Sequence, residues 1–194
     1  MAKGTWIALG VLGAIALLLI GVVGAAVGTY NDLTNEDVAI DAQSKQVDVQ
    51  YQRAFRLVPQ IVNLSETYVD KTSEAYARIV ALRAGVERAE NGTIAEKEAA
   101  AQQIGPTFNF MVEAYPDIRT DVIYGGLIAE IVNTENKIAI EKTRYNDKVE
   151  LFNAHRRQCC LPLVVAGMFG FDQREYIGFE GRPNTSTFPA DEQL

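Results

Sequence analysis

The 194-residue sequence has few of the side chains from which metal sites and disulfide frameworks are built, since it holds two cysteines and one histidine. It also lacks a Gly-rich phosphate loop, a nucleophile elbow and an HExxH motif. We therefore expect no enzyme activity, no metal and no cofactor. Basic clusters are missing as well, and the net charge of −7 argues against nucleic acid as a partner.

His155, Cys159 and Cys160 form the one grouping that a metal or redox site could use. His155 and Cys159 are four residues apart and share one face of a helix, but structural zinc sites usually have four ligands. We interpret Cys159 and Cys160 as small apolar residues packed where a helix ends. The alternative is that their thiols pair and cross-link two chains in an oxidising compartment.

The sequence does contain a long apolar run, from Trp6 to Val27, without a charged side chain. At about 1.5 Å per helical residue this run extends about 33 Å, enough to cross a bilayer's hydrocarbon core. It exceeds the roughly 7–15 apolar residues of a signal peptide, so we predict a transmembrane anchor over residues 1–29, with a cleaved signal peptide as the alternative. Lys3 precedes the run, and positive charge favours the cytoplasmic side. We expect a single-pass cell-membrane protein with its N-terminus in the cytoplasm and the rest outside.

Glycines recur along this anchor. Gly24 and Gly28 form a GxxxG motif, preceded by Gly10, Gly13 and Gly21, and such small residues let transmembrane backbones approach closely. We predict association of anchors through Gly21, Gly24 and Gly28. Neither a proline nor a flexible linker follows before the next helical pattern begins, so we expect the anchor and the first bundle helix to form one nearly continuous helix.

Residues 40–86 keep a heptad register, which predicts one long helix. Pro59 lies inside this helix and predicts a kink, because proline removes a backbone hydrogen bond. The heptad positions are Ile40, Ser44, Val47, Tyr51, Ala54, Val58, Ile61, Ser65, Tyr68, Thr72, Ala75, Ile79, Leu82 and Val86.

Turn residues end this helix and open a second one. Asn91-Gly92 tolerates the left-handed conformation that ends a helix, and Thr93 with Glu96 forms a capping box. The second helix is expected to reach about Ala114 and to bend or split at Gly105-Pro106.

A third helix is predicted from Pro116 to Arg157, because proline suits the first helical turn and apolar residues recur at helical spacing beyond it. The predicted fold class is all-α: a single N-terminal transmembrane helix followed by an antiparallel bundle of long helices, with the bundle at residues 30–180. Leu161–Phe171 is expected to form a short helix that closes one end of the core. The alternative is a surface for self-association or shallow membrane contact. Residues 181–194 are expected to form a flexible tail.

Short motifs follow the anchor in a fixed order: Tyr30-Asn31, Val47–Gln50, Arg56–Val62, Glu113–Ile118, Glu135–Ala139, Arg144–Val149 and Phe152-Asn153. Together they resemble the LemA family. The resemblance implies a membrane-anchored helical bundle without established catalytic residues. Residues 156–160 depart from the family pattern. The motif residues to which we assign structural roles are Tyr30, Asn31, Pro59, Tyr115, Pro116, Arg144, Tyr145, Asn146 and Asn153.

Asn146 and Asn153 are seven residues apart and return to nearly the same helical face. Buried asparagines can fix the register of packed helices, and the alternative is a ligand-binding patch. Three asparagines begin N-x-S/T sequons and are candidate glycosylation sites: Asn63, Asn91 and Asn184.

Two functions without catalysis follow from these features. The preferred hypothesis is a membrane-tethered structural or scaffold protein that forms homo-oligomers through the anchor and the bundle. The alternative is a monomeric adaptor or binding module that presents the bundle to another membrane or envelope protein.

Overall fold

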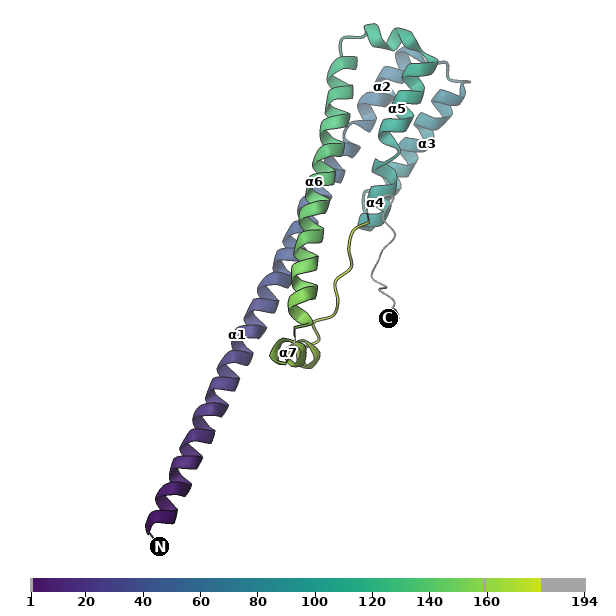
Figure 1. Ribbon diagram of the computed structural model, residues 1–194. Coiled ribbons are helices and arrows are strands. Elements are labelled where there is room, and N and C mark those ends of the chain that lie inside the picture. Colours follow the sequence, from purple (N-terminus) through teal and green to yellow (C-terminus); the bar gives the residue numbers. More distant parts are fainter. Residues whose placement is uncertain (1, 159, 179–194) are drawn as a thin grey trace, which may run out of the picture. The chain divides into compact units, whose positions relative to one another are not determined.

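The computed structural model describes residues 2–158 and 160–178, and the regular structure of these residues is entirely helical (Figure 1). The predicted all-α class, with one long N-terminal apolar helix followed by further helices, is confirmed. The elements are α1 (Ala2–Phe55), α2 (Val58–Tyr68), α3 (Glu74–Ala89), α4 (Ile94–Ala101), α5 (Ile104–Ala114), the 3-10 helix η1 (Pro116–Thr120), α6 (Tyr124–Arg156) and α7 (Leu161–Phe169).

The chain divides into two compact units. Unit 1 consists of Met1–Asp41 and Asn146–Leu194, and unit 2 consists of Ala42–Tyr145. The boundaries fall inside α1 and inside α6.

The first helix, α1, is a single helix of 54 residues. It contains the apolar run and the first heptads, and Gly28 and Thr29 are helical within it. The predicted continuity between the anchor and the first bundle helix is therefore confirmed.

The predicted kink at Pro59 is wrong, because the helix ends there and a new one begins. α1 stops at Phe55, and α2 starts at Val58 with Pro59 in its first turn. Pro59 has no N–H to donate to the carbonyl of Phe55, whereas the first turn of a new helix needs no such donor.

The predicted long helix has a second break, at residues 69–73, that the heptad pattern did not indicate. The Asp70 carboxylate accepts hydrogen bonds from the backbone N–H and the hydroxyl of Thr72, both at 2.8 Å. These bonds hold the pKa of Asp70 below its usual range. Ser73 then caps α3 by accepting a hydrogen bond from the N–H of Tyr76. A local turn and an N-cap thus replace the helix.

The second helix begins as predicted and then splits. Thr93 and Glu96 form the capping box that opens α4. The split falls at Gln102–Gln103, which places Pro106 in the first turn of α5. The break thus lies two residues before Gly105-Pro106, where the sequence predicts a bend or a split.

The third long helix starts later than predicted. Pro116 opens the short helix η1, and α6 begins only at Tyr124, although its end at Arg156 agrees with the prediction. Between them, Oδ1 of Asp121 accepts a hydrogen bond from the N–H of Ile123 at 2.9 Å. This side chain to backbone bond favours a turn over continuation of the helix.

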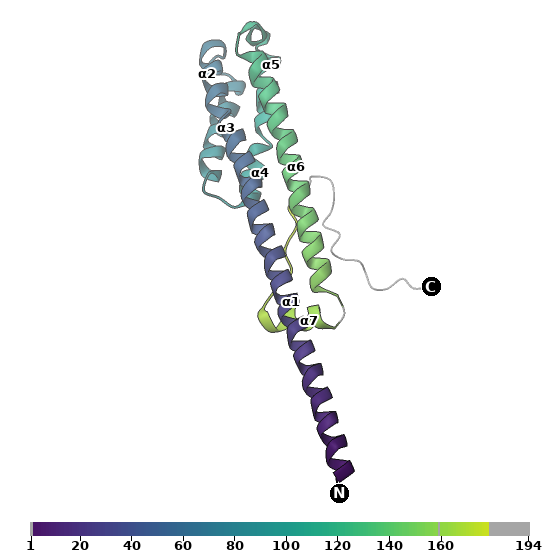
Figure 2. The same ribbon diagram turned by 90° about the vertical axis from the view of Figure 1, so that its left-hand side faces the viewer.

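The core of unit 2 forms around α3, which contacts α2, α4 and α5 (Figure 2). Most predicted heptad positions are buried, although Thr72 is exposed in the unpredicted turn. The fully buried large side chains of this unit are Val47, Tyr51, Val58, Ile61, Ile79, Phe108, Met111 and Ile118. In unit 1 they are Leu33, Ile40, Val149 and Phe152.

Candidate functional site

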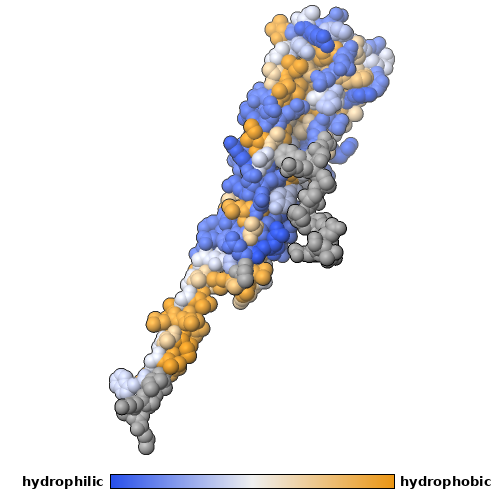
Figure 3. Space-filling model, in the orientation of Figure 1, coloured by the Kyte–Doolittle hydropathy of each residue, from blue (hydrophilic) through white to orange (hydrophobic). Residues whose placement is uncertain are grey.

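The N-terminal part of α1 is long and apolar enough to cross a membrane, and none of its apolar window is buried against the rest of the chain. Figure 3 shows this segment as an apolar surface. A Cβ atom built on Gly21, Gly24 or Gly28 would meet no atom within 4 Å outside the local helix backbone. The described part of the chain therefore leaves the small-residue face uncovered, where a neighbouring helix could pack.

An aromatic cluster, formed by Tyr30, Phe152, Phe169 and Phe171, lies in unit 1 where the apolar part of α1 ends. The ring centroid of Tyr30 is 4.8 Å from that of Phe169 and 5.6 Å from that of Phe171. Phe171 and Phe152 are 6.4 Å apart. These tilted and edge-on arrangements are favourable for aromatic pairs. They attach α7 and the residues after it to α1 and α6.

The chain turns back after α7 at Gly170. This residue has φ 73°, in the left-handed region that glycine adopts without strain. The N–H of Phe171 donates to the carbonyl of Ala166 at 3.0 Å, as in a Schellman motif. The reversal directs the following segment along α6.

Asn146 and Asn153 bind this segment, residues 171–178. Nδ2 of Asn153 donates to the carbonyl of Arg174 at 2.9 Å, and Oδ1 accepts from the N–H of Arg174 at 3.1 Å. Asn146 makes the same two bonds with Ile177, at 2.9 and 3.0 Å. Each amide uses its donor and its acceptor on one residue, as the backbone of a neighbouring strand would. The partner of these asparagines is thus an extended segment, where the sequence had suggested another helix.

The Arg174 side chain provides a further attachment. Its Nε and Nη2 lie 2.7 and 2.8 Å from the two carboxylate oxygens of Asp37, and Nη2 is 3.3 Å from Oδ1 of Asp41. Nearby in the same unit, Nδ1 of His155 lies 3.0 Å from Oε1 of Glu36. A bidentate arginine–carboxylate pair has defined geometry as well as charge. Arg174 is therefore held through both its backbone and its side chain.

The structure gives no support to a metal site at His155. Within residues 2–158 and 160–178, no three His, Cys, Asp or Glu side chains come together as metal ligands. Cys160 is exposed and has φ 74° where α7 begins. Cys159 lies outside the described residues, so the pairing of the two thiols stays a prediction.

Unit 2 contains a buried layer of charged groups. Nζ of Lys97, on α4, lies 2.5 Å from Oδ1 of Asp48 on α1. Lys142, on α6, pairs with Glu98 on α4. Burial, and secondarily the charge of Glu98, raises the pKa of Tyr51, whose hydroxyl has no hydrogen-bond partner among the described residues. That hydroxyl stays protonated near neutral pH, and the two ion pairs join α4 to α1 and to α6.

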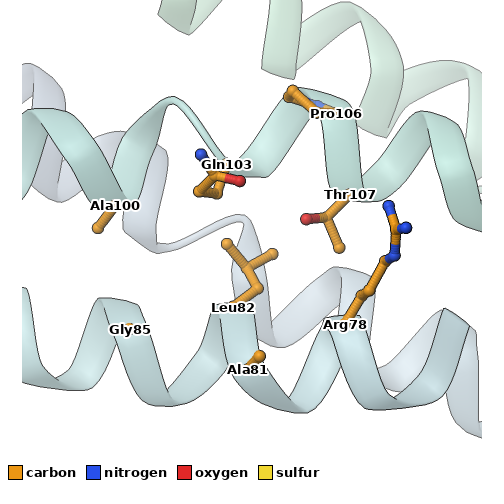
Figure 4. Close-up of a pocket in the computed structure, with 8 residues that line it drawn as sticks. All are labelled: Arg78, Ala81, Leu82, Gly85, Ala100, Gln103, Pro106 and Thr107. Carbon is orange, nitrogen blue, oxygen red and sulfur yellow. The ribbon is translucent and has the colours of Figure 1, made fainter. Parts of the chain in front are cut away.

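A groove of about 370 Å³ lies between α3 and the α4–α5 segment (Figure 4). Leu82 and Ala81 line it from α3, and Gln103 and Thr107 line it from the opposite side. The guanidinium of Arg78 at its edge stacks 3.8 Å from the centroid of Phe110. Neutral and apolar groups line most of the groove, which suits a docking surface better than acid–base chemistry.

Comparison with sequence families provides the classification. The LemA family model matches residues 43–188, most of the chain. The protein belongs to the LemA family. This match contains the two asparagines, the C-terminal segment and the buried charged layer. It begins after the apolar run and after Tyr30-Asn31, so those features lie outside the matched region. LemA is not known as an enzyme family, and a comparison with curated proteins finds no match.

Other motif residues of this LemA chain make local contacts. The hydroxyl of Tyr115 accepts a hydrogen bond from the N–H of Asp70 at 3.3 Å. Arg144 pairs with Glu141 at 2.7 Å on the surface of α6. Asn31 is exposed on α1. Tyr115 and Arg144 therefore make contacts of a structural kind.

The sequons differ in what the structure says of them. Asn63 and Asn91 are exposed, the first on α2 and the second in the turn after α3. Asn184 lies outside the described residues.

Tyr145, the last residue of unit 2, is half-buried.

Sequence reasoning missed Arg174 and its acidic partners. Asp37 and Asp41 are four residues apart and share a helical face, which is a weak signal for one basic partner. Arg174 is separated from Asp37 by 137 positions. A helical pattern reports only neighbours a few residues apart, so it could not identify this pair.

Proposed function

We propose that this LemA protein is a membrane-anchored structural or scaffold protein without catalytic function, and that its chains associate through the apolar span and the bundle. The observation that carries the proposal is the uncovered glycine face of α1 on a helix that continues to Phe55. The uncovered groups lie on the element that would cross the membrane. Contact there requires no rearrangement of the described chain.

The glycines form one narrow face. At about 100° per residue, Gly10, Gly13, Gly21, Gly24 and Gly28 fall within an arc of about 80°. Lipid tails are as apolar as the helix, so helices associate in membranes by close packing, which small residues permit. Because α1 is unbroken from this face to Phe55, contact between two spans would also hold the next helical residues of both chains close together.

The mass of the full-length protein in mild detergent tests the proposal. The wild type is expected to be an oligomer, and Gly24→Leu and Gly28→Leu are expected to shift it toward the monomer by separating the backbones. Ala16→Leu is the matched control, since it adds the same side chain about 100° from the centre of the glycine face. A protein that is strictly monomeric at high concentration, in both detergent and lipid, would overturn the proposal.

The proposed orientation places the N-terminus in the cytoplasm, because Lys3 precedes the span. Val122 is 97% exposed in unit 2, so a cysteine placed there can report sidedness. In a background with Cys159→Ser and Cys160→Ser, a membrane-impermeant maleimide should label Val122→Cys in intact cells. Labelling that requires lysis would place the bundle in the cytoplasm.

A monomeric adaptor is the second candidate, and the groove between α3 and the α4–α5 segment favours it (Figure 4). A photo-cross-linking residue at Ala81, inside the groove, should then attach to one specific partner. The same residue at Ala77, exposed on α3 outside the groove lining, is the control. Equal attachment from both positions would exclude specific docking there.

A further inference from the structure

We propose that α7 lies in the interface of the membrane that the span crosses, with phospholipid covering its outward face. This inference rests on the membrane anchor of the proposed function, and it is independent of self-association. It assigns a lipid-binding role to residues Leu161–Phe169.

The composition of α7 is the first reason. Its sequence, LPLVVAGMF, contains no polar side chain. A helix that is apolar on all sides is expected to be covered on all sides. Within the described chain, only Val165 and Ala166 of α7 are buried.

The uncovered residues form one face. Leu163, Val164 and Met168 are 55%, 54% and 75% exposed. At about 100° per residue they occupy an arc of about 140°, centred opposite the buried Val165 and Ala166. A continuous exposed apolar face on a helix marks a contact with another apolar phase.

The position of α7 within unit 1 indicates which phase that is. Phe169 packs on Tyr30 at 4.8 Å, which places the end of α7 at the level where the apolar run of α1 ends. The two views agree that α7 lies crosswise to α1 (Figures 1 and 2). A helix crossing α1 at this level lies along the membrane plane. Its nine residues extend only about 13 Å, too short to span a bilayer.

Aromatic residues mark the same level independently. Trp6 and Tyr30 are both exposed, and their separation of 24 positions corresponds to about 36 Å along the helix. Trp and Tyr are enriched at the two interfaces of a membrane, on either side of a hydrocarbon core of about 30 Å. Tyr30 therefore marks one interface, and its contact with Phe169 places α7 in it.

The residues flanking α7 fit this placement. Arg157 before the helix and Asp172 after it are exposed, so charge faces water at both ends of the apolar segment. Figure 3 shows apolar surface at α7 as well as along the apolar part of α1. One lipid phase covers both surfaces, whereas a protein partner would have to cover α7 beside lipid.

Tryptophan fluorescence tests this proposal in the full-length protein. The chain has one tryptophan, so Trp6→Phe gives a dark background into which Met168→Trp is placed. The protein is reconstituted into phosphatidylcholine vesicles whose acyl chains are brominated close to the headgroup. We expect a blue-shifted emission that the brominated lipid largely removes and that aqueous acrylamide quenches weakly.

Two control positions make the result specific. Val38 is 60% exposed on α1 and lies about 12 Å beyond Tyr30, so Val38→Trp should be quenched by acrylamide and not by the brominated lipid. Leu17→Trp lies near the middle of the span and reports the anchor itself, in vesicles whose acyl chains are brominated near their terminal methyl groups instead. If it is not quenched by brominated lipid, the anchor is wrong and α7 loses its basis.

If Leu17→Trp is quenched, the anchor is correct, and either of two results would then overturn the proposal for α7. If Met168→Trp is quenched like Val38→Trp, α7 lies in water. If Met168→Trp is shielded from both quenchers, protein covers α7. Leu163→Trp, on the same face of α7, repeats the measurement if Met168→Trp fails to fold.

Discussion

The attachment of the C-terminal segment to α6 gives a prediction with a calculable size. Asn153 is completely buried, and its amide makes two hydrogen bonds with the backbone of Arg174. Asn153→Leu keeps similar volume but removes both bonds. At about 1 kcal/mol for each hydrogen bond, the free energy that holds residues 171–178 against α6 should fall by about 2 kcal/mol.

Hydrogen–deuterium exchange measures this loss at the affected amide. The N–H of Arg174 donates to Asn153, so its exchange reports the opening of this contact. A loss of about 2 kcal/mol corresponds to about 30-fold faster exchange. Asn146→Leu should act mainly at Ile177, whose N–H is bound to Asn146.

Asn136→Leu is the control, because Asn136 is an exposed asparagine on the same helix, and its replacement should leave both amides unchanged. The reasoning fails if Arg174 exchanges at the wild-type rate in Asn153→Leu. It also fails if amides throughout α3 accelerate as much as Arg174, since the substitution would then have weakened the protein as a whole.

Three further predictions concern stability and are measured by thermal unfolding in detergent. Gly170→Ala should lower the free energy of unfolding by about 1 kcal/mol, because φ is 73° at this position. Gly167→Ala, inside α7, should raise it by about 0.5–1 kcal/mol. Equal effects of the two substitutions would contradict the left-handed cap. Lys97→Met should cost about 1–2 kcal/mol, because Asp48 loses its buried partner while 28% of the Asp48 side chain stays exposed, and adding Asp48→Leu should recover much of the loss. The bonds from Thr93 lower the pKa of Glu96, so this carboxylate stabilises the fold above its unfolded pKa of about 4.3 and loses that effect as the pH falls through its folded pKa. The unfolding temperature of Glu96→Gln should therefore fall less than that of the wild type between about pH 5 and pH 3, and parallel curves would contradict this.

The heptad pattern predicted which residues of the first helices are buried, but not how many helices carry them. Tyr68 and Ala75 are one heptad apart, so the period continues through the turn at residues 69–73. The signals for this turn were chemical, since Asp70 and Thr72 bond to each other and Ser73 caps α3. Burial depends on spacing, whereas helix ends depend on local hydrogen bonding, and the two must be considered separately.

The sequence also identified Asn146 and Asn153 as a pair on one face of α6 without identifying their partner. The amides contact residues 31 and 21 positions away, in an extended segment. Helical periodicity gives the direction of a side chain, but the partner depends on the reversal at Gly170 and on the packing of Phe171 against Tyr30. The same limit applies to Lys97 and Lys142, whose burial against carboxylates follows from tertiary packing alone.

The alternatives for Leu161–Phe171 show how sequence and structure combine. The sequence allowed a helix that closes the core or a surface for membrane or self-contact. In the structure, Leu161–Phe169 is helical. Val165 and Ala166 are buried, whereas Leu163 and Met168 are exposed. One short helix therefore has both a buried face and an exposed apolar face, because all of its side chains are apolar.

We propose that chains of this protein associate in the membrane through the glycine face of α1. The most direct test is the mass of the full-length protein in patches of its own membrane, extracted with a polymer and without detergent, for the wild type and for Gly24→Leu. This association predicts a discrete oligomer for the wild type and a shift toward the monomer for Gly24→Leu. A single-chain mass for the wild type across all concentrations, or an identical oligomer for both proteins, would contradict it.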